Sequence, residues 1–411
     1  MRIKRLKNKK IYLCIIVYFF TLFIFMVGNE LLCKNASASH MEINDTPTDS
    51  TTKSEEKLNE NIYELLDSLD LQALQSYVDS LGLSDSKTVK ERLISYVKGE
   101  SFQFDELGKI LQTVLFDKIF EVLPVFACIA AITLLSGLIS TLRIGTLAHT
   151  SADMIFLITY ASALLPLIGV ISECFLQSKA SVGEMKTQMQ IVLPIMLTLI
   201  ATSGGSLTVA LCKPAVAFFT TTIVSVIFSV VFPLTVAIIA FSMASNLTKE
   251  LKINKFTAFF KSINKWVIGL SISVFGIFIT LQGLTAATHD GIVRRAAKYA
   301  IGSGVPIVGG FLSGGFDLAV AGTVLIKNSL GNLSVFLMVS VLFEPMVLLI
   351  ATNVLLRFTA AITQPFGESR ISDFLGETAD NLHYCSAGIL FTAFMYFLSV
   401  VILVTATEAL F

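Results

Sequence analysis

The chain has 411 residues, of which 54% are hydrophobic and 15% are charged, and its formal net charge is zero. Its mean hydropathy of +0.76 is far above what a water-solvated surface allows. The composition therefore predicts an all-α, multi-pass membrane protein, and the balanced charge gives no reason to expect a nucleic acid partner.

Residues 1–38 have the order of a secretory signal peptide. Basic residues between Arg2 and Lys10 precede an apolar run from Ile11 to Gly28, and small residues follow at Ala36 and Ala38. We expect cleavage after Ala38, so that the following residues lie on the far side of the cytoplasmic membrane. An uncleaved anchor is the alternative, because the apolar run is nearly long enough to span a bilayer.

The next two segments are too polar to cross a membrane. Residues 39–57 have no apolar period and predict a flexible tether. Residues 58–119 predict a small extracytoplasmic helical segment, because apolar residues recur at three- and four-residue steps. These residues are Ile62, Leu65, Leu66, Leu69, Leu74, Tyr77, Val78, Leu81, Val89, Leu93, Ile94 and Val97. The apolar stripe can pack within the protein or dock a partner helix, and the alternative is that it lies flat on lipid.

Residues 120–411 predict a multi-pass transmembrane domain of about eight helices, since roughly 20 apolar residues cross the hydrocarbon. The predicted spans are Glu121–Thr141, Asp153–Phe175, Met189–Leu211, Ala215–Ser245, Trp266–Thr288, Val305–Ile326, Ser334–Leu356 and Cys385–Thr407. The block 189–245 is compatible with two passes, three passes, or one pass and a re-entrant hairpin. Lysines and arginines are evenly divided between the two sets of loops, so the positive-inside rule does not fix the orientation.

The segment 246–266 combines five lysines with apolar residues at helical spacing. This pattern predicts a basic amphipathic helix that lies along the membrane interface and is anchored by Trp266.

The motifs that carry nucleotide, metal or hydrolytic chemistry are missing from the sequence. The segment from Gly322 lacks the second glycine of a phosphate-binding loop, and Ile307 stands where a dinucleotide fingerprint needs its third glycine. The chain contains no C-x-x-C, H-E-x-x-H or G-x-S-x-G motif. We therefore expect no enzyme activity, no catalytic residues, no metal site and no cofactor.

The glycine-rich stretch "GSGVPIVGGFLSGGFDLAVAG" at residues 302–322 is the most distinctive local feature. On a helix, Gly310, Gly314, Asp317 and Ala321 fall within an arc of about 60°, and Gly315 begins a second small ridge beside them. Such a surface lets another transmembrane helix approach closely. The alternative is a broken helix or re-entrant loop around residues 305–310 that lines a cavity.

Glu344 and Pro345 are the second candidate site, because a carboxylate lies near the middle of a predicted span. Pro345 removes a backbone hydrogen bond and predicts a kink or break. An ionised Glu344 at this depth is costly, so we expect it to face the bundle interior, to pair, or to be protonated. Its role is either structural or that of a residue in a pathway or gate.

Three stretches resemble a known family: "TSGGSLTVALCKPAV", "GLTAATHDGIVRRAAKYAIGSGVPIVGGFLSGGFDLAVAGTVLIKNSLG" and "FEPMVLLI". With the signal sequence and the helical segment, they are similar to the stage III sporulation protein AE family of endospore-forming Firmicutes. The resemblance covers nearly the whole chain after residue 60.

The resemblance implies an integral membrane subunit of a secretion-like channel complex that joins the mother cell and the engulfed forespore. It also implies partnership with other stage III sporulation membrane proteins and a separate ATPase, and residence in the outer forespore membrane. The alternative is a stand-alone secondary transporter or permease whose substrate binds at a broken helix.

Overall fold

The computed structural model describes residues 49–81, 88–98, 104–142, 149–247, 253–304, 309–366 and 369–405. It divides the chain into two compact units, residues 1–57 and residues 58–411. The first unit is described only where helix α2 (Asp49–Ser68) begins. This start lies inside the segment that was predicted to be a flexible tether. The proposed signal peptide lies outside the described residues, so both it and its cleavage at Ala36 and Ala38 stay predictions.

The regular secondary structure in the described part of the larger unit consists of helices without strands, which confirms the all-α class. After α2 the helices are α3 (Gln72–Ser80), α4 (Val89–Val97), α5 (Phe104–Leu142), α6 (His149–Thr202), α7 (Ser206–Phe218), α8 (Val224–Val226), α9 (Phe232–Leu247), α10 (Asn254–Gly304), α11 (Gly309–Phe366) and α12 (Ser369–Thr405). Two π-helical turns, η1 (Phe219–Ile223) and η2 (Ile227–Val231), join α7, α8 and α9 into one interrupted helix.

The short helices α3 and α4 pack on the long ones. A capping box formed by Thr88 and Glu91 starts α4. The buried residues of the predicted apolar stripe are Ile62, Leu66, Leu74, Tyr77, Val78, Val89 and Leu93. Helix α3 contacts α6 and α4 contacts α11, so the stripe docks on the protein and does not lie on lipid. Helix α5 begins at Phe104 and passes through residue 119 without a break, across the predicted domain boundary.

Helix α6 contains the predicted span Asp153–Phe175 and most of Met189–Leu211, and α11 contains most of Val305–Ile326 and all of Ser334–Leu356. Helix α6 has 54 residues and α11 has 58, so each is about 80 Å long or more, well over twice the hydrocarbon thickness. The segment 176–188 contains Lys179, Glu184 and Lys186, which is why it was predicted to be a loop. It continues α6 because Cys174, Ser178, Ser181, Met185 and Gln188 extend one buried stripe at steps of four and three residues.

The block 189–245 contains one turn. Helix α6 ends at Thr202, and Gly204 has φ +91°, a conformation that glycine adopts without steric cost. Helix α7 then begins at Ser206, and Lys213 and Pro214 lie inside it, not at a boundary. The block therefore consists of the end of α6 and one interrupted helix, and the predicted span Met189–Leu211 is split between them.

Six described helical segments are long and apolar enough to cross a membrane, judged by length and composition. They are Phe116–Leu135, Phe156–Thr202, Cys212–Leu247, Asn254–Thr280, Val320–Pro365 and Arg370–Thr405. The predicted count of eight is not confirmed, because two pairs of predicted spans lie for the most part within continuous helices. Of the segment predicted to be an interfacial helix, residues 254–266 are the first part of α10, which continues past Trp266, while residues 246 and 247 end α9. Its position along the membrane interface stays a prediction.

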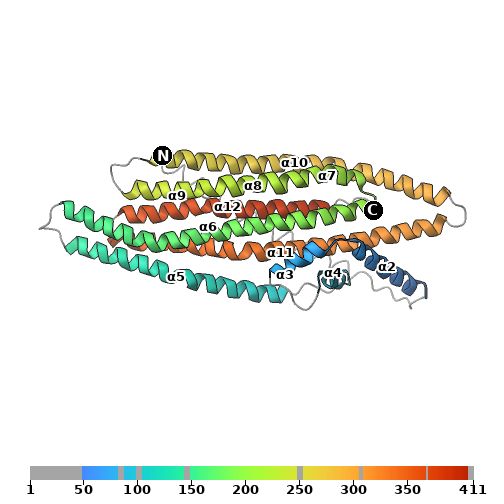
Figure 1. The fold of residues 1–411 in the computed structure, drawn as a ribbon, viewed down its shortest axis with the longest axis horizontal. Helices are drawn as coiled ribbons and strands as arrows, with labels where there is room; N and C mark the ends of the chain where they lie inside the picture. The colour runs from blue at the N-terminus through green and yellow to red at the C-terminus, as the bar shows by residue number, and fades with distance from the viewer. Residues whose placement is uncertain are drawn as a thin grey trace. The chain divides into compact units, whose positions relative to one another are not determined.

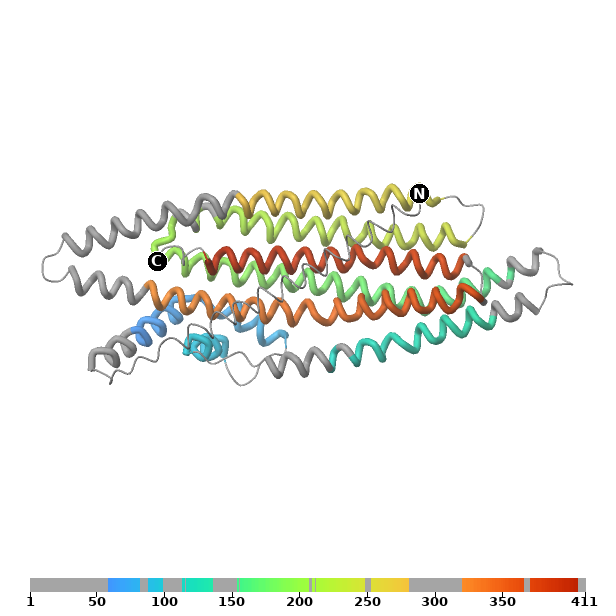
Figure 2. Tube along the Cα trace, turned by 180° about the vertical axis from the view of Figure 1, so that it is seen from behind, coloured from blue at the N-terminus to red at the C-terminus, as the bar shows by residue number. Residues whose placement is uncertain are grey.

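Helix α12 is the central element of the larger unit. The most apolar stretch of α12 is 56% buried, whereas that of α10 is 17% buried. It packs against α11, α6 and α9 (Figure 1). Figure 2 shows α10 beside α9 and α11 beside α12 from the opposite side. The functional residues described next lie mainly where α12 meets its neighbours.

Candidate functional site

The glycine-rich stretch is helical from residue 309 onward. Gly310, Gly314, Gly315 and Asp317 lie in the first turns of α11, and Ala321 follows half-buried. The surroundings of the side chains before Val320, and the backbone of residues 305–308, lie outside the described residues. The predicted helix contact of Asp317 and the alternative re-entrant loop therefore both stay predictions.

Gly322 is the first glycine of this stretch whose neighbours are described. A Cβ atom there would lie 3.4 Å from Ile62 Cγ1 and 3.6 Å from Leu65 Cδ1 of α2. The small residue thus lets the side chains of α2 reach the backbone of α11. At Gly322 the end of the glycine-rich stretch thus packs against another helix of the same chain.

Glu344 is exposed at the outer face of α11 and pairs with a lysine of α5. Its Oε1 lies 3.1 Å from Lys118 Nζ, which also pairs with Glu121 at 3.1 Å. Of the three expected outcomes, pairing is the one observed, while the carboxylate does not face the bundle interior. Pro345 is buried next to it, and α11 continues through Pro345 as a helix, so the predicted break does not occur.

A buried hydrogen-bond junction joins α3, α6 and α11. Gln188 Nε2 donates to Tyr77 Oη at 2.9 Å and to the Leu337 carbonyl at 3.0 Å. Tyr396 of α12 lies beside Ser334 at the same junction. Burial raises the pKa of Tyr77 to about 12, against a smaller opposite effect of the Gln188 hydrogen bond and a smaller supporting effect of Glu184. The neutral phenol is thus the stable form within the docked helix.

Two thiols lie deeper between α6, α11 and α12. Cys174 Sγ lies 3.4 Å from Thr352 Oγ1, and Cys385 is its neighbour on α12. Both cysteines are fully buried and free. They fill small spaces at close helix contacts, which is the usual use of buried cysteine.

Lys327 is the most unexpected residue of α11. The sequence places it in a loop after a predicted span, but its side chain is fully buried in the middle of the continuous helix. Hydropathy alone could not assign it, because a window average does not distinguish a covered lysine from a loop lysine.

A single carboxylate, Glu377, lies where α12 meets α9. Glu377 Oε2 accepts hydrogen bonds from Ser242 Oγ and from Asn246 Nδ2, the latter at 3.5 Å. Tyr160 of α6 donates at 2.8 Å to the carbonyl of Met243, the residue that follows Ser242. One turn further along α12, Asn381 is fully buried. Sequence reasoning missed Glu377 and Asn381, although Thr378, Asn381, Cys385 and Thr392 are a polar series at helical spacing in an apolar segment.

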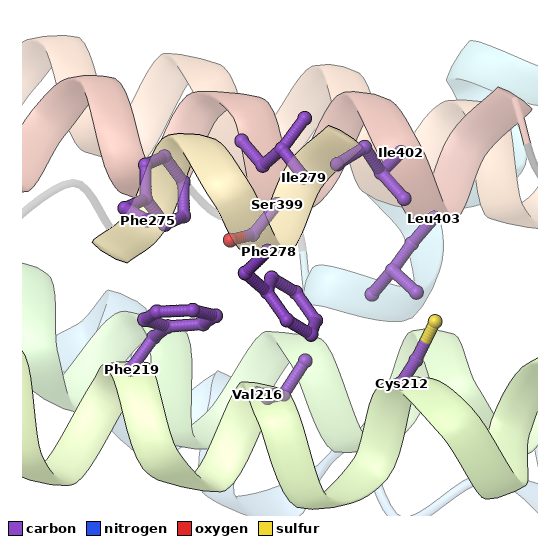
Figure 3. Close-up of a pocket in the computed structure, with 9 residues that line it drawn as sticks. All are labelled: Cys212, Val216, Phe219, Phe275, Phe278, Ile279, Ser399, Ile402 and Leu403. Atoms are coloured by element: carbon purple, nitrogen blue, oxygen red, sulfur yellow. The ribbon is translucent and has the colours of Figure 1, made fainter. Parts of the chain in front are cut away.

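A pocket lies between α7, α10 and α12. Its nine lining residues are Cys212, Val216, Phe219, Phe275, Phe278, Ile279, Ser399, Ile402 and Leu403 (Figure 3). The Phe219 ring packs against Phe275 and Phe278, with centroids 5.1 Å and 4.6 Å apart. Ser399 Oγ donates to the Met395 carbonyl, so its hydroxyl is already used in the helix. The lining offers apolar contact and no acid–base pair.

Histidine, cysteine, aspartate and glutamate do not gather in groups of three or more within the described part of the chain. The polar groups found instead are single carboxylates, amides and hydroxyls at helix contacts. This arrangement can fix helices relative to one another and can hold water or a small ion.

Comparison with known proteins gives a family and no solved relative. The family described as Stage III sporulation protein AE matches residues 88–407. The chain is 23% identical over 318 residues to the Stage III sporulation protein AE of Bacillus subtilis (strain 168), which covers 77% of this chain and 80% of that protein. No solved structure matches. Because the family match extends over most of the chain, from α4 to the end of α12, this protein belongs to the stage III sporulation protein AE family.

Proposed function

We propose that this protein is a non-enzymatic integral membrane subunit of a secretion-like channel complex that links mother cell and forespore and is required for sporulation after engulfment. The observation that carries the proposal is the family match over residues 88–407 on a chain with six candidate membrane-spanning segments. The sequence contains no nucleotide-binding motif, so we assign energy supply to a separate ATPase subunit. Other stage III sporulation membrane proteins and membrane lipid are the further partners.

The proposal also places the protein in the mother-cell-derived outer forespore membrane. A cleaved signal peptide would put α3 and α4 in the space between the two membranes that surround the forespore. The helices docked on α6 and α11 would then be the part nearest to partners in that space.

The deciding experiment is affinity isolation of the intact assembly from sporulating cells with a tag at the C-terminus. We expect co-isolation of other sporulation membrane proteins and an ATPase. A matched preparation from vegetative cells expressing the same tagged chain should lack them. Recovery of the protein alone from sporulating cells would contradict the subunit role and favour the stand-alone transporter.

A further inference from the structure

Three buried polar atoms lie on one turn of α12 without a hydrogen-bond partner. They are Thr378 Oγ1 and both side-chain polar atoms of Asn381, and both residues are fully buried. An amide or hydroxyl in an apolar interior costs several kcal/mol when it is left unpaired, about 4–8 in the most apolar surroundings. In native proteins such groups are rare, and a bound water or ion is one of the features that accounts for them.

Glu377 shares this face of the helix. Residues four apart on an α-helix lie one turn above each other, so Glu377 and Asn381 are neighbours. At about 100° per residue, Glu377, Asn381 and Thr378 fall within an arc of roughly 100°, with Asn381 between the other two. The three side chains therefore form one oxygen-rich patch on α12.

The patch faces the line where α12, α9 and α6 meet. Ser242 and Asn246 of α9 hold Glu377 on one side of the arc. On the other side, Phe374 of α12 packs edge-on against Tyr160 of α6, with centroids 5.6 Å apart. Asn381, between these directions, lies at the junction of the three helices.

The described neighbours of the Glu377 carboxylate are uncharged groups, so none of them balances its charge. Its interactions within the described chain are with Ser242, Asn246 and Tyr160, and no lysine or arginine pairs with it there. It is half-buried inside the candidate span Arg370–Thr405. A carboxylate at membrane depth needs a proton or a cation to compensate its charge.

We propose that this junction binds one alkali metal cation, with Glu377, Thr378 and Asn381 of α12 and Ser242 of α9 as oxygen ligands. Carboxylate, hydroxyl and amide oxygens are the donors that hard cations prefer. A single carboxylate balances a single positive charge, whereas a divalent ion would leave a net charge in an apolar interior. The site holds α12 to α9, and the proposal does not depend on the channel role.

The test is the thermal unfolding of the full-length chain in detergent, measured in NaCl, in KCl and in choline chloride of equal ionic strength. Binding to the folded state alone should raise the Tm in the alkali salts by roughly 2 °C for each tenfold rise in cation above its Kd. The preferred ion is the one that gives the larger shift. An equal Tm in all three salts would overturn the proposal, since it would leave a protonated Glu377 and bound water as the explanation.

Two variants and one control make the assignment specific. Glu377→Gln and Asn381→Leu should each abolish the salt-dependent shift. Asn381→Leu should also be at least as stable as the wild type in choline chloride, because it removes unpaired polar atoms. The control is Glu173→Gln, an exposed carboxylate of α6 that contacts Gln177. Loss of the shift in the control, or its survival in both site variants, would contradict the site.

Should a variant fail to fold, binding of radioactive sodium to the wild-type protein is measured instead, in competition with unlabelled NaCl. Absence of saturable binding would overturn the proposal.

Discussion

Gln188 and Tyr77 are 111 residues apart in the chain and share a hydrogen bond of 2.9 Å. The bond joins α3, in the segment predicted to be extracytoplasmic, to α6, which is long enough to cross the membrane. Gln188 also binds the Leu337 carbonyl, so one amide links three helices. The docked position of α3 therefore depends on an interaction inside the bundle.

Changing the two partners of this bond should have unequal effects. Tyr77→Phe removes only the acceptor, because Gln188 keeps its bond to Leu337, and should lower the free energy of unfolding by about 0.5–1.5 kcal/mol. Gln188→Leu removes both bonds and leaves the buried Tyr77 hydroxyl without this partner, so it should cost about 1–3 kcal/mol. Thermal unfolding, with trypsin cleavage at Lys90 and Arg92 as a local measure, checks this. The exposed Tyr63→Phe is the control, and equal effects of the three changes would contradict the junction.

The same junction should be sensitive to alkaline pH. The pKa of Tyr77 rises from its ordinary value of 10 to about 12 on folding, mainly through burial. A group with a raised folded pKa contributes stability that is fully present below pH 10 and is lost as pH rises through 12. Between these values the wild type should lose more stability than Tyr77→Phe. The pKa of Tyr96 is also raised by burial, but its contribution is the same in both proteins.

A double-mutant cycle on Lys118 and Glu344 measures their coupling energy, which tells whether this face of α11 lies in lipid or in water. Both residues lie in candidate spans, so we expect a coupling above the roughly 0–1 kcal/mol of a water-exposed pair. Lys118→Met should destabilise more than Glu344→Gln, because Lys118 keeps its pair with Glu121 when Glu344 is replaced. The control is the pair Lys90 and Asp67 outside the spans, which should show almost no coupling. An equally small value for both pairs would place Glu344 in water.

Two glycines inside helices should respond oppositely to alanine. A Cβ at Gly331 would lie 2.7 Å from Val404 Cγ2 and 3.5 Å from Met196 Cε, so Gly331→Ala should destabilise by about 1–3 kcal/mol. At Gly376 nothing lies within 4 Å, and alanine should stabilise by about 0.5–1 kcal/mol through helix propensity. Thermal unfolding measures both, and adding Val404→Ala should relieve the Gly331→Ala defect. A defect unchanged by Val404→Ala would contradict the predicted clash.

The glycine-rich start of α11 can be tested in sporulating cells. If the ridge is a packing surface, Gly314→Leu should prevent accumulation or assembly of the protein, while Asp317→Asn should be mild. Protein level, co-isolated partners and spore yield are the measurements. Loss of function in Asp317→Asn at normal level and assembly would show that packing alone does not explain the aspartate.

The helix boundaries show where prediction from sequence failed. Charged residues between 176 and 188 and at Lys327 were interpreted as ends of spans, because hydropathy averages treat a charge as a break. In the structure these segments continue α6 and α11, since Ser178, Ser181 and Gln188 have protein neighbours and Lys327 is covered. Pro345 likewise did not end its helix.

The sequence by itself determined the all-α class, the membrane character, the buried stripe of α2 to α4 and the family. These properties follow from composition, from spacing along one helix and from distinctive local motifs, all of which can be read without knowing which helices touch. Only the tertiary structure decided how many helices are continuous, that Glu344 pairs with Lys118, that Gln188 meets Tyr77, and that Glu377 bonds Ser242 and Asn246. Whether a polar side chain ends a helix or stabilises its packing depends on partners contributed from distant parts of the chain, and one-dimensional spacing carries no information about them.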